Sequence, residues 1–117
     1  MKKLGYIFGI FCMLALLHSC LNEPKFDKSL LSGKWQQGTL FEKYFSDGTG
    51  YTWDEGDDVK EHEAQKFEWT LDDVNLTQIH LGEMGQKVPK SYKVTELTKT
   101  SFKYKDAYGT SYTFIKN

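Results

Sequence analysis

The spacing of hydrophobic and polar residues changes near residue 33 and divides the chain into parts of different character. Residues 4–17 are almost wholly apolar, whereas from Gly33 onward apolar side chains recur at every second position. A period of two is typical of β-strands with one buried face and one solvated face. The pattern therefore predicts an apolar leader followed by an all-β domain.

The alternating segments are short, and each lies next to a turn signal. After a first strand that begins at Gly33, they cover residues 39–45, 50–53, 65–71, 76–81, 92–95, 101–105 and 112–114. Turn residues gather at 47–50, 72–73, 82–89 and 107–109. About eight strands in sequential order predict a small up-and-down antiparallel barrel without free strand edges. A Greek-key sandwich is the alternative, with the polar segment 55–63 as its crossover.

A single helical turn is predicted just before the first strand. Phe26, Leu30 and Leu31 share one side of such a turn, and Asp27 can cap its beginning. Because a helical segment of this length is not stable alone, we expect it to pack on the β-domain.

The apolar leader is too short to span a membrane permanently. Lys2 and Lys3 precede it and form a positive n-region. A helix over residues 4–17 would reach about 21 Å, which is less than the ~30 Å hydrocarbon core of a bilayer. This segment is therefore predicted to be the apolar region of a signal peptide.

The end of the leader carries a more specific motif. Leu17-His18-Ser19-Cys20 resembles the lipobox of bacterial lipoproteins. The resemblance implies cleavage before Cys20 and acyl chains on Cys20, which together anchor a protein durably. It divides the chain into a signal peptide (1–19), a lipidated tether (20–25) and a folded domain (26–117). By resemblance to Gram-negative lipoproteins, we expect the outer membrane, on either face; an ordinary secretory signal is the alternative.

Composition and charge exclude several classes of function. A length of 117 residues allows one domain, and the formal net charge is only -1. All 15 basic residues are Lys, so guanidinium recognition of phosphate is absent and no nucleic-acid partner is expected. Cys12 leaves with the leader and Cys20 carries lipid, so the mature domain is predicted to have no thiol chemistry.

A family resemblance begins at the first strand. Gly33-Lys34-Trp35 resembles the Gly-x-Trp motif of lipocalins, and residues 47–50 and 109–114 are similar to small lipocalin-like lipoproteins of Gram-negative bacteria. The resemblance implies that Trp35 closes the narrow end of an eight-stranded barrel, which the preceding turn plugs. In lipocalins a late Arg packs on this Trp; here Lys116 is the nearest substitute.

The resemblance also implies a ligand at the mouth of the barrel, and aromatic side chains are the candidates to bind it. Aromatic residues make up 15% of the chain. The candidate ligand-binding residues are Trp35, Tyr44, Trp53, Phe67, Trp69, Tyr92, Tyr104 and Tyr112. We expect a small apolar or amphipathic ligand. A core simply filled by these side chains is the alternative, since an eight-stranded barrel is just wide enough to be filled.

No catalytic, metal or cofactor site is predicted, and the protein is expected to be non-enzymatic. After processing only His62 and His80 remain among the histidines, without a His-Glu-x-x-His or Gly-x-Ser-x-Gly motif. His80 is expected to face water or the mouth. The acidic residues of segment 54–63 are predicted to form a solvated loop, because their spacing does not match a calcium-binding loop. The alternative function is that of an accessory cell-envelope lipoprotein that binds a protein partner.

Overall fold

The computed structural model describes residues 26–117. The predicted signal peptide, the tether and the lipid attachment at Cys20 lie outside the described residues and remain predictions. No helix of the described part of the chain is long and apolar enough to cross a membrane.

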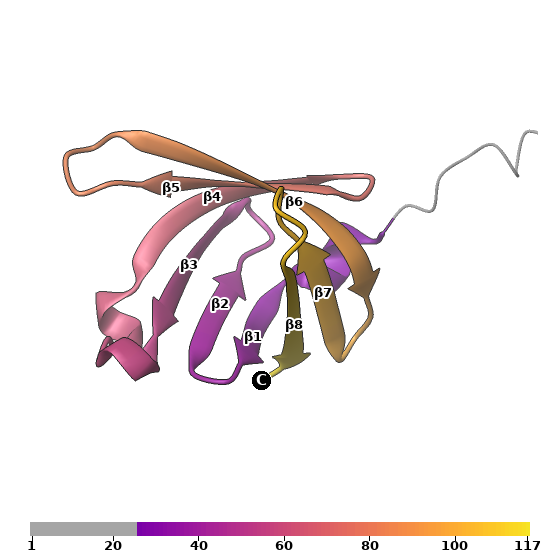
Figure 1. The fold of residues 1–117 in the computed structure, drawn as a ribbon, viewed down its shortest axis with the longest axis horizontal. Coiled ribbons are helices and arrows are strands. Elements are labelled where there is room, and N and C mark those ends of the chain that lie inside the picture. The colour runs from indigo at the N-terminus through magenta and orange to yellow at the C-terminus, as the bar shows by residue number, and fades with distance from the viewer. Residues whose placement is uncertain (1–25) are drawn as a thin grey trace, which may run out of the picture.

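The described residues form one closed barrel of eight antiparallel strands (Figure 1). The strands are β1 Gly33–Gln37, β2 Leu40–Tyr44, β3 Thr49–Asp54, β4 Gln65–Asp72, β5 Asn75–Leu81, β6 Lys87–Leu97, β7 Ser101–Lys105 and β8 Ser111–Lys116. Each strand pairs with the next in sequence, and β8 pairs with β1 through Trp35 and Lys116. This arrangement confirms the all-β up-and-down barrel and excludes the sandwich.

Short 3-10 turns complete the fold. The first, η1 (Lys28–Leu31), is capped by Asp27, whose carboxylate accepts a hydrogen bond from the Ser29 amide at 2.9 Å. Leu31 at its end is fully buried, so the predicted helical turn does pack on the barrel. The other turns, η2 (Glu55–Asp57) and η3 (Glu61–Glu63), lie in the connection from β3 to β4.

The barrel is closed beneath η1 by the Gly-x-Trp segment. The indole Nε1 of Trp35 donates to the carbonyl oxygen of Leu31 at 2.8 Å. The Nζ of Lys116 lies 4.6 Å from the centroid of the Trp35 ring and donates to the carbonyl oxygen of Ser32. Gly33 has a φ of 125°, and a Cβ at this position would collide with the end of the Lys116 side chain. The missing Cβ of Gly33 therefore leaves room for the Lys116 ammonium group that lies over the Trp35 indole.

The interior is filled largely by aromatic and aliphatic side chains from all strands except β3. The buried cluster consists of Leu31, Trp35, Tyr44, Phe67, Trp69, Leu76, Val94, Leu97, Phe102, Tyr104 and Phe114. Several rings contact one another edge to face, such as Tyr44 with Trp69 at 5.6 Å between centroids. Such pairs add to the stabilisation that burial itself provides.

The hairpin of β5 and β6 extends beyond its neighbours, on the side away from η1 (Figure 1). The predicted loop 82–89 is too long, because β6 already begins at Lys87 and Pro89 pairs with Ile79. Pairing of β6 with β7 starts only at Lys93. Pro89 therefore lies where β6 is an edge strand, and its missing N–H costs no ladder hydrogen bond.

Gly50 should not tolerate any side chain, because the ring of Phe67 packs against β3 at the place that a side chain of residue 50 would occupy. A Cβ at Gly50 would collide with the carbonyl oxygen of Lys43 and lie 2.7 Å from a ring carbon of Phe67. We expect Gly50→Ala to lower the free energy of unfolding by about 2 kcal/mol, measured by chemical denaturation.

The control for this prediction is Gly38→Ala, at a turn glycine whose added Cβ has no heavy atom within 4 Å. That variant carries only the backbone cost of its φ of 59°, about 1 kcal/mol. Equal losses at Gly38 and Gly50 would contradict a steric role for Phe67.

Candidate functional site

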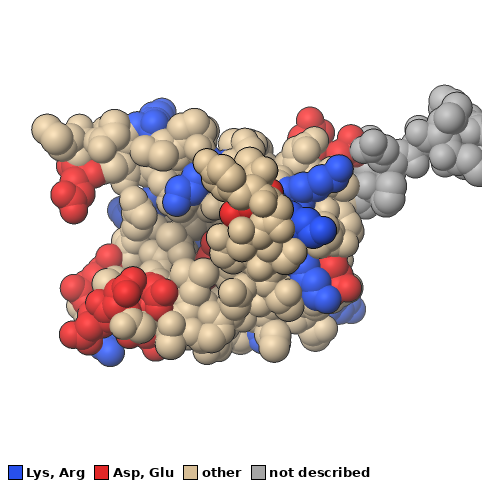
Figure 2. Space-filling view, in the orientation of Figure 1, with Lys and Arg blue, Asp and Glu red and all other residues tan. Residues whose placement is uncertain are grey.

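The barrel opens on the side opposite η1. There the projecting β5–β6 hairpin and the acidic η2–η3 connection lie on either side of a hollow in the surface (Figure 2). We call this opening the mouth. Cross-strand partners share one face of a sheet, so the pairing of Thr52 with Gln65 and of Val88 with His80 places these side chains on its inner wall.

The β3 side of the mouth contains an open pocket with a volume of about 340 Å³. Its lining residues are Leu40, Thr52, Trp53, Asp54, Val59, Glu63 and Gln65. On the opposite side, the inner face of β6 is open to solvent, because Val88 is 42% exposed and Lys90 is also exposed. The mouth thus combines apolar and polar side chains.

A chain of polar side chains crosses the interior behind the mouth. Tyr104 and Tyr44 donate hydrogen bonds to the two carboxylate oxygens of Glu42, at 2.9 and 2.7 Å. The amide Nε2 of Gln78 donates to the Tyr44 hydroxyl oxygen at 2.5 Å, and Gln78 Oε1 lies 2.8 Å from His80 Nε2. We call these five residues the polar chain. All five are buried, with exposed fractions of 5% or less.

Burial dominates the electrostatics at Glu42. Desolvation raises the pKa of the Glu42 carboxyl above its usual range, and the hydrogen bonds from Tyr44 and Tyr104 partly oppose this shift. Desolvation, followed by the charge of Glu42, raises the pKa values of the Tyr44 and Tyr104 hydroxyls well above their usual range. Both hydroxyls therefore remain protonated donors to the carboxylate.

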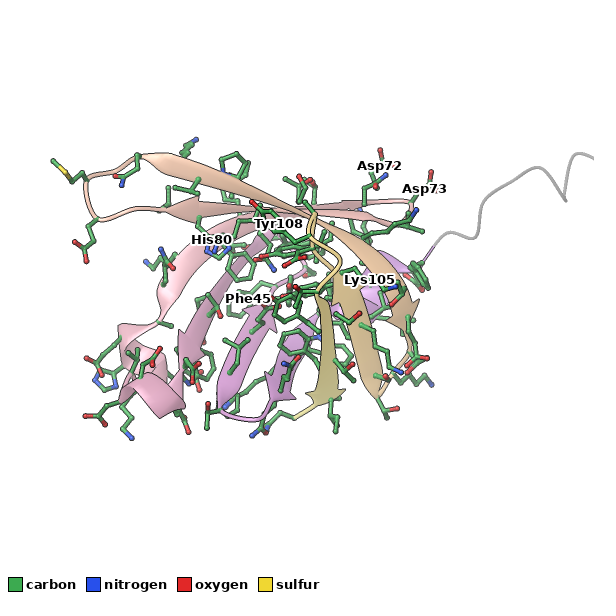
Figure 3. All side chains as sticks on the ribbon, in the orientation of Figure 1. Phe45, Asp72, Asp73, His80, Lys105 and Tyr108 are labelled. Atoms are coloured by element: carbon green, nitrogen blue, oxygen red, sulfur yellow. The ribbon has the colours of Figure 1, made fainter. Side chains whose placement is uncertain are left out.

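His80 projects from β5 into the interior at the mouth (Figure 3). Burial, and secondarily the charge of Lys90, lowers the pKa of His80 to about 4, so the imidazole is neutral at pH 7. Its ring lies 5.2 Å from that of Phe67. Its Nδ1 atom is buried and has no hydrogen-bond partner among residues 26–117. Of the two alternatives expected for His80, water or the mouth, the structure favours the mouth, because its position in β5 turns it inward beside Phe67.

Seven of the eight candidate ligand-binding residues line the barrel interior. Trp35 and Phe67 belong to its packed core, and Trp69 donates to the backbone of the β2–β3 turn. Tyr44 and Tyr104 belong to the polar chain. The remaining two, Tyr92 and Tyr112, are half-buried, with ring centroids 4.3 and 5.2 Å from that of Tyr104. Of these seven, Tyr92 and Tyr112 are thus the ones accessible from outside.

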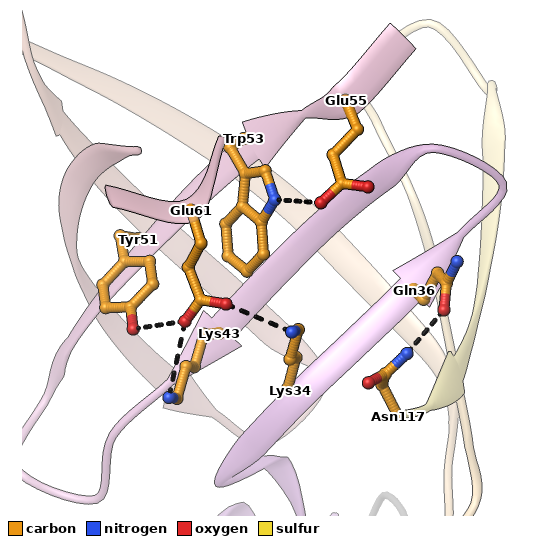
Figure 4. A network of polar contacts seen from close by, with 8 residues as sticks. All are labelled: Lys34, Gln36, Lys43, Tyr51, Trp53, Glu55, Glu61 and Asn117. Atoms are coloured by element: carbon orange, nitrogen blue, oxygen red, sulfur yellow. Dashed lines mark hydrogen bonds and ion pairs between the residues drawn. The ribbon is translucent and has the colours of Figure 1, made fainter. Parts of the chain in front are cut away.

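The eighth candidate, Trp53, lies on the outer face of the barrel. Its indole stacks on Phe41 of the neighbouring strand, with 4.9 Å between centroids, and Lys34 Nζ lies 5.2 Å from each ring. Glu61 of η3 accepts hydrogen bonds from Lys34 at 3.1 Å and Tyr51 at 3.0 Å (Figure 4). The acidic connection is therefore partly fastened to the barrel wall and is less solvated than its composition suggests.

Glu42 and Gln78 are functional candidates that were not predicted from the sequence. Each carries a detectable signal, because Glu42 alternates with Leu40 and Tyr44, and Gln78 lies between Leu76 and His80 at the same spacing. Strict alternation places both inside the barrel. Buried polar groups of this kind are found with hydrogen-bond partners, as they are here.

The fold and the site together define a structural class of protein. It is a small closed antiparallel barrel with a buried polar chain behind an open mouth. This architecture is consistent with a lipocalin-like fold. Within the described residues, no three His, Cys, Asp or Glu side chains gather so that they could hold a metal ion. Comparison of the chain with protein-family models, curated proteins and solved structures gives no match.

The depressed pKa of His80 predicts a loss of stability in mild acid. The unfolded chain binds a proton near pH 6.5, whereas the folded protein does so only near pH 4. The contribution of neutral His80 to stability is therefore complete above pH 6.5 and is lost as the pH falls from 6.5 to about 4. We expect a loss of about 2 kcal/mol between pH 7 and pH 4 that His80→Gln removes, measured by urea denaturation at each pH. A variant with the pH profile of the wild type would contradict this assignment.

The contacts of Glu61 that hold η3 to the barrel wall predict a smaller loss of unfolding free energy than the titration of His80. Glu61→Ala removes the acceptor shared by Lys34 and Tyr51, and since Glu61 is 40% exposed we expect a loss of about 0.5–1 kcal/mol. Hydrogen exchange of the connection should accelerate, and the effect should shrink in high salt. The control is Asp57→Ala, which removes an equal charge from the same connection; equal acceleration in both would contradict a specific contact.

Proposed function

We propose that this protein is a lipid-anchored, non-enzymatic barrel that binds a small amphipathic ligand at its mouth. The observation that carries the proposal is the juxtaposition of half-buried Tyr92 and Tyr112 with the buried polar chain at the open side of the barrel. Aromatic walls with a few placed polar groups are typical of small-molecule sites. The pocket of about 340 Å³ beside Thr52 and Gln65 lies within the size range of such sites.

The proposed anchor and the mouth lie on opposite sides of the barrel. Five residues, 21–25, separate Cys20 from Phe26, and the six Cα-to-Cα steps of an extended chain between them would reach about 20 Å. The chain enters the barrel through η1, which lies away from the η2–η3 connection (Figure 1). Acyl chains on Cys20 would therefore hold the closed side near the membrane and leave the mouth facing the aqueous phase. Outer-membrane attachment by this route agrees with the lipobox-like motif.

Native mass spectrometry of the protein purified from its own host tests the binding function. We expect a small molecule to be retained, and we expect Tyr92→Ala with Tyr112→Ala to release it. The control is Ile115→Ala, at a side chain that is 66% exposed on the outer face of β8. Failure of the wild-type protein to retain any small molecule, together with failure to bind an amphipathic fluorescent dye, would refute the proposal.

The anchor has a separate test in intact cells. Cys20→Ala should release the protein from the membrane fraction, because a single unacylated tether offers no apolar anchor. A variant that is cleaved yet stays membrane-bound would contradict the lipid anchor while leaving the ligand site unaffected.

A second function, docking to a protein of the cell envelope, is favoured by a groove on the outer wall. Phe45, Tyr51 and Leu81 line a pocket of about 350 Å³, and Phe45 and Leu81 are 38% and 40% exposed. Cross-linking in intact cells should then trap one dominant partner, and Leu81→Lys should abolish the product. A protein that remains monomeric in that experiment would exclude this function.

A further inference from the structure

The direction of the hydrogen bonds in the polar chain follows from Glu42. Both carboxylate oxygens of Glu42 accept a tyrosine O–H, one from Tyr104 and one from Tyr44, so the Tyr44 proton points to Glu42. The Tyr44 oxygen is then left to accept from the Nε2 amide of Gln78. This orientation turns Gln78 Oε1 towards His80 as an acceptor. His80 must consequently carry its proton on Nε2, because hydrogen-bond networks determine the tautomer of a neutral imidazole.

The polar chain thus ends in an acceptor without a donor. With the proton of His80 on Nε2, its Nδ1 presents a bare lone pair, which is buried and lacks a partner among the described residues. Leaving such a group unpaired costs free energy, and native structures rarely do so without a reason. Phe67 faces the ring without a hydrogen-bonding group, and Lys90 acts on His80 only through its charge.

We propose that Nδ1 of His80 receives a hydrogen bond from the ligand, so that the barrel selects small amphipathic molecules with a neutral O–H or N–H group. Phenols, alcohols and amides meet this requirement. Ethers and carboxylates present only lone pairs to Nδ1, and cations are disfavoured by the neighbouring Lys90 charge. This inference rests on the proposed ligand-binding function and names the class of ligand that the same site takes.

A pair of probes that differ only in the donor tests the inference. The full chain carrying Cys20→Ala is titrated with 1-naphthol and with 1-methoxynaphthalene, whose hydroxyl is capped by a methyl group. We expect the protein to bind 1-naphthol about three- to tenfold more tightly, as one net hydrogen bond provides. His80→Phe, which keeps an aromatic ring, should abolish this ratio, whereas His62→Phe on exposed η3 should preserve it.

The outcomes separate the inference from the function on which it rests. If both naphthalenes bind equally, or if the ratio survives in His80→Phe, donor recognition is refuted while the ligand site stands. If neither probe binds, the ligand site itself is refuted, and the inference falls with it.

A measurement on the unliganded wild-type protein tests the hydrogen-bond direction without any binding experiment. It is also unaffected if the His80→Phe variant is misfolded. Nitrogen-15 NMR of His80 at pH 7 should show a neutral imidazole with its proton on Nε2 and a bare Nδ1. Addition of 1-naphthol should shift the Nδ1 resonance, and 1-methoxynaphthalene should leave it in place. A proton on Nδ1 in the unliganded protein would overturn the inference.

Discussion

Replacement of Trp35 by Ala is expected to lower the free energy of unfolding by about 3–5 kcal/mol. Trp35 is fully buried, and its ring centroid lies 5.4 Å from that of Phe102. The variant also leaves the carbonyl oxygen of Leu31 without its indole donor and Lys116 without the ring it covers. A loss of this size consumes much of the stability of a single small domain. Urea denaturation monitored by far-UV circular dichroism measures it.

Two further variants divide this loss into its causes. Trp35→Phe keeps a buried ring but removes the indole N–H, so it should cost less than Trp35→Ala. Lys116→Met keeps the aliphatic stem and removes the cation 4.6 Å from the indole, for which we expect a loss of about 1 kcal/mol. If Lys116→Met has no effect in the wild type, the cation does not stabilise the closure of the barrel. Lys116→Arg, whose planar guanidinium stacks well on an aromatic face, should at least match the wild type.

The architecture could be predicted from local sequence patterns, because the alternation and turn residues of each segment are sufficient to predict its strand and hairpin. The alternation from Gln65 to Leu71 and the Asp72-Asp73 turn specify a hairpin without reference to distant residues, and the structure confirms it as β4 and β5. Pro89 shows the limit of such reasoning. A proline in a run reads as a loop residue, yet it is accommodated here because its strand lacks a second neighbour, which is a property of the whole barrel.

The candidate site was less predictable, because it depends on which face of each strand points into the barrel and on which distant side chains lie opposite it. Trp53 and Glu42 illustrate the difficulty from opposite sides. Trp53 is aromatic and was a candidate to bind the ligand; its parity in β3 places it on the outer face with Phe41, although it still lines the pocket at the β3 side of the mouth. Glu42 is charged and attracts no attention in a sequence, but Tyr44 and Tyr104 supply the two donors that allow its burial. Tyr104 lies 62 residues away in the chain, so no local pattern reveals that partnership.

Tyr44→Phe is expected to lower the free energy of unfolding by about 3 kcal/mol at pH 7, although it removes a single oxygen atom. The hydroxyl donates to Glu42 at 2.7 Å and accepts from Gln78 at 2.5 Å. Its removal takes one donor from a buried carboxylate and strands a buried amide N–H. The control is Tyr112→Phe, whose half-buried hydroxyl lies outside the polar chain and should cost less than about 0.5 kcal/mol.

The pH dependence of this loss identifies the carboxylate as its main cause. The hydrogen bond from Tyr44 lowers the pKa of Glu42 against the larger effect of burial, so Tyr44→Phe raises that pKa further above its unfolded value of 4.5. The lost hydrogen bond penalises only the ionised carboxylate of the folded protein, so the extra cost is present above the raised folded-state pKa of Glu42 and disappears as the pH falls through it. His80 titrates in both proteins and cancels to first order in their difference. The difference in unfolding free energy between wild type and Tyr44→Phe should therefore shrink between pH 7 and pH 4 to the residual cost of the stranded Gln78 amide. A difference that is constant with pH would show that Glu42 is uncharged in the folded protein, and would remove the basis for assigning the tautomer of His80.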